Sequence, residues 1–291
     1  MRLQDYGVGV FKAALTKSSL KKALKKNYIT VNELVATSAT FINGGEHICL
    51  TIPKNESPSK QFIFPLNVLF EDEHLAVIHK PASILVSANR FKTIANTLTQ
   101  NLKRSTQPDA TKPQPAHRLD YATTGILLVG KTSSSIRALN QLFKAKTVTK
   151  TYFSVTIGEM DTEGKITSAI DEKPSESNYK VLESVDSKRF GKFNLVELQP
   201  KTGRRHQLRK HLASIGNPIL GDKDYGIEGL ILNGKGLYLH AYSLRFVHPF
   251  TNKKVYLKDD FPKRFEKLFS SKITKIFAED VETENNRNIN L

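Results

Sequence analysis

Residues 117–125 read His117-Arg118-Leu119-Asp120-Tyr121-Ala122-Thr123-Thr124-Gly125 and lead into the apolar segment 126–129. On an extended backbone Arg118 and Asp120 project to the same side, because they are two positions apart, while Leu119 turns to the core. A cation and a carboxylate therefore stand side by side ahead of a turn and a buried strand. A surface ion pair followed by a turn gives the same pattern, so these residues alone leave the role of Asp120 open.

The sequence on either side of this stretch, about residues 61–275, alternates strand-like and helix-like segments. Buried strands are expected at 75–78, ended by Lys80-Pro81, and at 126–129. A helix fits 133–144, where apolar residues recur on one side.

Residues 151–157 alternate strictly, as one strand does. Phe153 and its alternate neighbours face the core, and Tyr152 lies on the opposite face with Ser154 and Thr156. A structural tyrosine is the more frequent explanation for such a residue, and a functional one the alternative.

Basic residues also gather around a helix that we expect at 204–215. Gly216 and Pro218 end this helix. Arg205 and Arg209 are four residues apart, so on a helix they stack on one face. The segment 201–206 before it is rich in basic residues, and a helix N-terminus attracts phosphate groups. A solvated basic helix end is the alternative interpretation.

Charge points to a polyanionic partner. The 291 residues contain 44 Lys and Arg against 28 Asp and Glu, a net charge of +16, and the pI is near 9.7. Such a field attracts nucleic acid or an anionic membrane surface. Because 39% of the residues are apolar, a packed core is expected and global disorder is excluded.

Several classes of protein are disfavoured. Cys49 is the only cysteine, so neither an intrachain disulfide nor a cysteine zinc site is expected. The eight histidines show no compact metal spacing, and we predict no metal. The acidic run 71–73 is expected to be a loop. With no signal-peptide pattern and no apolar run of the ~20 residues that span a bilayer, we predict a cytoplasmic protein with no membrane partner.

The chain ends differ from this central region. Residues 1–60 predict a small basic module and linker, with Ser18 or Ser19 capping a helix and short strands at 29–31 and 48–50. On that helix four lysines lie outside the apolar stripe: Lys21, Lys22, Lys25 and Lys26. Residues 53–59 form the expected linker, and 276–291 predict a disordered acidic tail.

The central motifs resemble those of the RluA-type pseudouridine synthases. The resemblance is carried by His117 to Leu128, by Thr202-Gly203-Arg204-Arg205-His206-Gln207-Leu208-Arg209, by Lys150-Thr151-Tyr152, and by Lys80-Pro81 and Leu239-His240-Ala241. It covers about residues 66–260. It implies an α+β pseudouridine-synthase fold, with a mixed, largely antiparallel central sheet and flanking helices, preceded by a small α/β RNA-binding module.

Residues 18–50 resemble the αL RNA-binding domain, which is shared with a small-subunit ribosomal protein and is often fused ahead of these synthases. Ser19 to Leu24, Ile29 to Asn32 and Gly44 to Ile48 carry this resemblance. The sequence departs from the pattern at Asn27, where a glycine is usual, and at Gly45-Glu46, where Gly-Asp is common.

The resemblance implies uridine isomerisation in RNA without cofactor or metal. Asp120 would be the catalytic carboxylate, Arg209 its cationic partner, and Tyr152 the residue against the uracil ring that takes up the released proton. Arg118 would fill the place that the flipped base leaves in the RNA stack. Leu208 would contact the face of the uracil ring opposite Tyr152. Arg205 and the four N-terminal lysines would bind RNA. Whether Asp120 attacks the base or the sugar stays open.

Three alternatives remain. An αL module favours ribosomal RNA, most of all that of the large subunit, over transfer RNA. A non-catalytic RNA-binding or ribosome assembly factor is the alternative of another class, and it predicts that Asp120, Tyr152 or Arg209 is lost. A membrane-surface protein would need an aromatic-rich amphipathic anchor, which the sequence lacks. A monomer is the default expectation.

Overall fold

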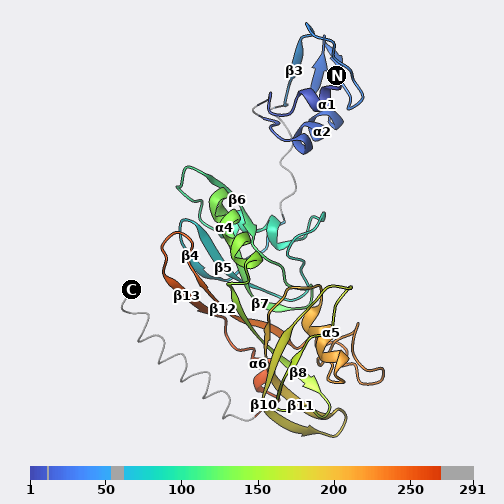
Figure 1. Cartoon of the computed structure of the whole chain (residues 1–291), viewed down its shortest axis with the longest axis vertical. Helices are drawn as coiled ribbons and strands as arrows, with labels where there is room; N and C mark the ends of the chain where they lie inside the picture. Colours follow the sequence, from blue (N-terminus) through green and yellow to red (C-terminus); the bar gives the residue numbers. More distant parts are fainter. Residues whose placement is uncertain (12, 54–61, 270–291) are drawn as a thin grey trace. The chain divides into compact units, whose positions relative to one another are not determined.

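The computed structural model describes residues 1–11, 13–53 and 62–269, and it divides into two compact units, Met1–Gln61 and Phe62–Leu291 (Figure 1). Most of the predicted linker, residues 54–59, and all of the predicted tail, 276–291, lie outside the described residues.

The first unit is a small α/β module. Its described elements are α1 (Leu3–Tyr6), α2 (Lys17–Lys25), β1 (Ile29–Val31), β2 (Leu34–Val35) and β3 (Ile48–Leu50), and the strands form an antiparallel sheet in the order β2-β1-β3. Leu3, Leu20 and Ile29 are fully buried in its core. The strands predicted at 29–31 and 48–50 are confirmed.

Helix α2 begins earlier than the sequence predicts. Its N-cap is Thr16 and not Ser18 or Ser19: the Thr16 hydroxyl accepts the Ser19 N–H, and the Ser19 hydroxyl accepts the Thr16 N–H. At the other end Asn27 has a φ of 59°, and the Tyr28 N–H donates to the Ala23 carbonyl. Asparagine tolerates this left-handed backbone better than most residues, which explains why it can stand where glycine is usual.

The second unit is built on one ten-stranded sheet. Eight strands follow the order β4-β5-β7-β12-β8-β11-β10-β9, with β13 paired to β12 and β6 to β7. Only the β7–β12 pair is parallel among the described pairs, so the predicted mixed, largely antiparallel sheet is confirmed. The strands are β4 (Val68–Glu71), β5 (Leu75–Lys80), β6 (Ala110–Pro115), β7 (Thr124–Thr132), β8 (Thr149–Ile157), β9 (Glu163–Ile166), β10 (Ser177–Ser187), β11 (Gly191–Pro200), β12 (Leu239–Val247) and β13 (Lys254–Lys258).

Short helices flank this sheet. They are η1 (Ile94–Asn96), α3 (Leu98–Asn101), α4 (Ser133–Lys144), α5 (Gln207–Ser214) and α6 (Lys263–Glu266). Leu139 of α4 packs with Val77 of β5 on one face, while Ile94 and Leu98 pack with Ile78 on the other. Both faces of the sheet are thus covered at β5 and β7. The predicted helix 133–144 is confirmed.

Burial on both faces corrects one expectation for β8. Ser154 and Thr156, expected on a polar face, are as fully buried as Val155. The reason is the place of β8 inside the sheet, between β11 and β12, where neighbouring strands and the segments packed on them cover it. Tyr152 is the half-buried residue of that face.

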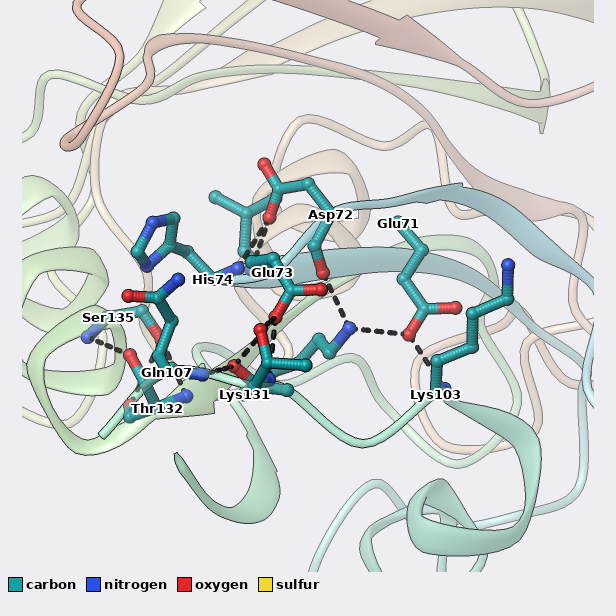
Figure 2. Close-up of polar contacts among 12 residues, drawn as sticks. Glu71, Asp72, Glu73, His74, Lys103, Gln107, Lys131, Thr132 and Ser135 are labelled. Carbon is teal, nitrogen blue, oxygen red and sulfur yellow. Dashed lines mark hydrogen bonds and ion pairs between the residues drawn. The ribbon is translucent and has the colours of Figure 1, made fainter. Parts of the chain in front are cut away.

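Of the acidic run 71–73, which was expected to be a loop, Glu71 is the last residue of β4, and Asp72 and Glu73 lie in the turn to β5. The run also anchors neighbouring segments (Figure 2). Nζ of the buried Lys131 donates to Glu71 Oε1 at 2.7 Å and to the Asp72 carbonyl. Glu73 Oε2 accepts the Thr106 N–H at 2.7 Å. These carboxylates serve the fold, because hydrogen bonds within the protein occupy them.

Gly125 marks the closest approach of β7 to β12. Its φ is +113°, and a Cβ at this position would lie 2.2 Å from the Ala241 carbonyl oxygen. Only glycine fits this backbone, and the parallel pairing of Gly125 with Ala241 fixes the chain directly after the Asp120 loop.

Candidate active site

Asp120 lies in the loop that joins β6 to β7. Leu119 is 6% exposed and belongs to a hydrophobic cluster, while Arg118 and Asp120 both line one cavity of about 710 Å³. The alternation predicted for this stretch is confirmed. The buried leucine holds the loop down, so its two charged neighbours face the cavity.

Lys80, the last residue of β5, holds the same loop through hydrogen bonds. Its side chain is fully buried, and Nζ donates to the carbonyls of Thr123 at 2.7 Å, Pro81 at 2.9 Å and Tyr121 at 3.3 Å. Burial lowers the pKa of Lys80 to about 8, and the charge of Asp120 opposes this shift. One ammonium group therefore ties the strand end to both sides of the turn after Asp120.

The cavity brings together residues from distant segments. Tyr152 comes from β8 and Leu208 from α5, and both line it with Asp120. Its basic lining residues are Arg118, Lys144, Lys146, Lys150, Lys201, Arg204 and Arg205. A cavity with one carboxylate and a predominantly cationic lining suits an anionic ligand that presents one group to Asp120.

Tyr152 is a neutral residue in this cavity. Burial raises its pKa, and the charge of Asp120 raises it further. The tyrosine is therefore a phenol at neutral pH, whose ring is apolar and whose hydroxyl feels the field of the carboxylate.

The start of α5 corrects one expectation. The helix begins at Gln207 and not at residue 204, because the Gln207 side chain accepts the Arg204 N–H at 3.0 Å and His206 takes a left-handed backbone with a φ of 55°. Such a backbone costs a non-glycine residue about 1–2 kcal/mol. Arg205 therefore lies in an exposed turn of the cavity rim, and it does not stack with Arg209 on one helix face.

Arg209 differs from its implied role as well. Its guanidinium donates to Asp222 at 2.7 and 2.6 Å and to Asp224 at 2.6 Å, and it makes no ion pair with Asp120. The direct partnership between Arg209 and Asp120 is thus wrong: Arg209 is committed to Asp222, which is 1% exposed. Arg209 and Asp120 interact electrostatically without a direct contact.

His206 is the residue that faces the carboxylate. Its Nε2 lies 3.9 Å from Asp120 Oδ1, and its Nδ1 lies 3.0 Å from the Tyr225 hydroxyl. Among the described residues no hydrogen bond to the Asp120 side chain occurs, and that side chain is 22% exposed. The oxygens of Asp120 are therefore held near a histidine without being bound to it.

Three residues around the site receive no role of their own from the sequence: Lys80, His206 and Tyr225. Lys80 and His206 lie within the motifs that carry the family resemblance, but those motifs do not show what the two side chains contact. A lysine that closes a buried apolar run does indicate a buried charge in need of acceptors. The contact of Tyr225 with His206 depends on the fold, so no local pattern predicts it.

Three of the four N-terminal lysines lie on α2 of the other unit, and the fourth, Lys26, is the C-cap residue of that helix. Lys21, Lys22, Lys25 and Lys26 are all exposed, as expected for residues outside the apolar stripe. Within residues 1–11, 13–53 and 62–269, no helix is long and apolar enough to cross a membrane.

Comparisons with known proteins identify the family of this chain. A family model described as RNA pseudouridylate synthase matches residues 74–214. A protein of Aquifex aeolicus named as an uncharacterized RNA pseudouridine synthase is 30% identical, over 88% of this chain and 89% of its own length. A Vibrio cholerae protein named ribosomal large subunit pseudouridine synthase C is 30% identical, over 83% of this chain and 84% of its own.

A solved structure is similar too. The human protein titled RNA Pseudouridylate Synthase Domain Containing 4 matches with a TM-score of 0.56 at 26% identity, over 68% of this chain and 90% of that one.

Proposed function

This chain belongs to the RluA-type RNA pseudouridine synthases, and we propose that Asp120 is the catalytic carboxylate of its reaction. The enzyme is an isomerase: the glycosidic bond to a base nitrogen breaks, the base turns, and a carbon–carbon glycosidic bond forms. The observation that carries the assignment is that Asp120, Tyr152 and Leu208 line one basic cavity.

Asp120 suits a nucleophile because its oxygens are available. A carboxylate bound to several donors is a weak nucleophile, whereas the Asp120 side chain accepts no hydrogen bond from the described residues and lies in a cavity with a predominantly cationic lining. Its lone pairs can bond either to the base ring or to the anomeric carbon of the sugar.

Tyr152 and Leu208 provide an apolar place for the uracil ring. Flipping the uridine out of its stack costs a few kcal/mol, and ring contacts in the cavity offset that cost. Arg118, exposed beside Asp120, is suited to fill the vacated stack through its planar guanidinium.

Tyr152 is also placed to take the proton from the newly bonded carbon. A neutral phenol can take up this proton only if it gives its own hydroxyl proton to another base at the same time. The base we assign is the carboxylate of Asp120, whose charge acts on the Tyr152 hydroxyl. The proton would then leave through Asp120 once its bond to the nucleotide has broken.

RNA would be held in two places. Arg205 and the other cations of the cavity rim would contact phosphates beside the target uridine. Lys21, Lys22, Lys25 and Lys26 would bind a second segment of RNA, in agreement with the resemblance of their module to the αL domain.

We favour large-subunit ribosomal RNA as the substrate. The supporting observation is that relatives from Vibrio cholerae and Nitrosomonas europaea are named ribosomal large subunit pseudouridine synthases C and D. Transfer RNA is the alternative. Ribosomal RNA would place the enzyme in the cytoplasm, and we propose that it acts there as a monomer without metal or cofactor.

A non-catalytic assembly factor is disfavoured. It predicts that Asp120, Tyr152 or Arg209 is lost, but Asp120 and Tyr152 line one cavity and Arg209 is buried in an ion pair with Asp222.

The test is Asp120→Asn, which keeps the size of the side chain and removes its charge. We expect a folded enzyme that binds RNA but forms no pseudouridine, measured by mapping pseudouridines in the RNA of a deletion strain that carries the variant. Asp186→Asn, at an exposed position of β10 outside the cavity, is the matched control and should restore modification. Turnover by the Asp120 variant would refute the assignment.

A further inference from the structure

His206 connects the catalytic loop to a second network. Its ring lies between Asp120, 3.9 Å from Nε2, and the hydroxyl of Tyr225, 3.0 Å from Nδ1. The rings of His206 and Tyr225 meet edge to face, with centroids 5.7 Å apart. The backbone of His206 is left-handed at this point, with a φ of 55°.

The chemistry of the neighbours determines which nitrogen carries the proton. An ionised carboxylate can only accept a hydrogen bond. Of the two neutral tautomers of His206, the one with its proton on Nε2 is therefore favoured, because that N–H faces Asp120. Nδ1 then has a lone pair, and the Tyr225 hydroxyl donates to it. Burial lowers the pKa of His206, which favours the neutral ring.

Tyr225 is itself held firmly. Its N–H donates to Asp222 Oδ1 at 3.2 Å, and the guanidinium carbon of Arg209 lies 4.9 Å from the centre of its ring. The buried Arg209–Asp222 pair thus fixes Tyr225, Tyr225 fixes His206, and His206 faces the carboxylate. This chain of contacts gives Arg209 a route to Asp120 that needs no direct ion pair.

We propose that His206 is a positioning residue for Asp120, and that the Tyr225 hydroxyl holds the His206 proton on Nε2, where it faces the carboxylate. The proposal rests on Asp120 being the catalytic carboxylate. It predicts that His206 and Tyr225 act as one unit on the chemical step and leave RNA binding unchanged.

Tyr225→Phe is the most selective variant. It removes one hydroxyl and keeps the ring that packs on Arg209 and His206, so the fold is preserved. Tyr256→Phe on β13 makes the same change outside the cavity and is the matched control. His206→Ala and His206→Gln complete the set, because glutamine offers an N–H at about the reach of Nε2.

Each variant is assayed for single-turnover rate and for RNA affinity. We expect Tyr225→Phe to lower the rate about tenfold at unchanged Kd, and His206→Ala to lower it further. Adding Tyr225→Phe to His206→Ala should cost nothing more, because residues that act as a unit are not additive. His206→Gln should recover part of the loss.

The contrary results are distinct. Losses that multiply in the double variant, or that fall on Kd alone, would overturn the proposal, as would normal rates in both single variants. Asp120→Asn is run alongside: if it turns over, the catalytic assignment fails, and if it is inactive while Tyr225→Phe and His206→Ala are normal, only the role of His206 fails.

Discussion

The guanidinium of Arg209 holds both carboxylate oxygens of Asp222, with Nε 2.7 Å from Oδ2 and Nη2 2.6 Å from Oδ1. Both side chains are buried, and Asp224 adds a third contact from the surface. Because a guanidinium fits a carboxylate with two parallel bonds, this pair fixes α5 to the chain at Asp222.

Replacing this arginine tests that support. Arg209→Lys keeps the charge but loses the two-pronged contact, and we expect the free energy of unfolding to fall by about 2 kcal/mol, as for hydrogen bonds to charged groups. Urea denaturation measures this. Arg245→Lys, exposed on β12, is the matched control. An unchanged midpoint for Arg209→Lys would show that the paired bonds do not stabilise the fold.

Removing the hydroxyl of Tyr152 separates packing from chemistry. Tyr152→Phe keeps the ring that packs against two hydrophobic clusters, so stability and RNA affinity should be retained. If the hydroxyl moves the proton, single-turnover rates should fall about 100-fold or more, the usual scale of general base catalysis. A rate close to that of the unchanged enzyme would exclude the hydroxyl from proton transfer.

Lys80 should make stability depend on alkaline pH. Its pKa is lowered to about 8 in the fold, against an ordinary value of 10.5, so between these pH values the unfolded chain binds more protons. The free energy of unfolding should therefore rise, relative to that of Lys80→Met, as pH increases from 8 to 10.5. Unfolding curves across this range measure the difference, and parallel curves for the two proteins would contradict it.

The N-terminal lysines should affect RNA binding without affecting chemistry. Replacing Lys21, Lys22, Lys25 and Lys26 with glutamine removes four exposed charges from α2, so the salt dependence of RNA affinity should flatten while the single-turnover rate at saturating RNA stays the same. Titrations at several salt concentrations measure the slope. The same slope in both proteins would mean that this helix does not contact RNA.

The sequence predicts elements best where the local pattern and the fold agree. Helix 133–144 has one apolar side and packs with that side, and Leu119 alternates with two polar neighbours as an extended chain requires. The start of α5 could not be predicted in this way, because a Gln207 side chain and one left-handed residue replace the first helical turn.

The partners of charged groups were harder to predict than the groups themselves. Arg209 was identified as important, but its choice of Asp222 over Asp120 depends on how the loop after α5 folds back. Lys80 finds its acceptors 41 and 43 residues away, at Tyr121 and Thr123. Spacing along a chain carries no information about contacts of this range.

The absence of a hydrogen bond on Asp120, among the residues the structure describes, bears on how the enzyme recovers after each reaction. A side chain clamped on both oxygens would have to leave its donors when it bonds the nucleotide and find them again on product release. Within the part of the chain that the structure describes, Asp120 has no such donors to recover, and the Arg209–Asp222 pair need not move. The catalyst can thus return to its starting state without rearranging the protein around it.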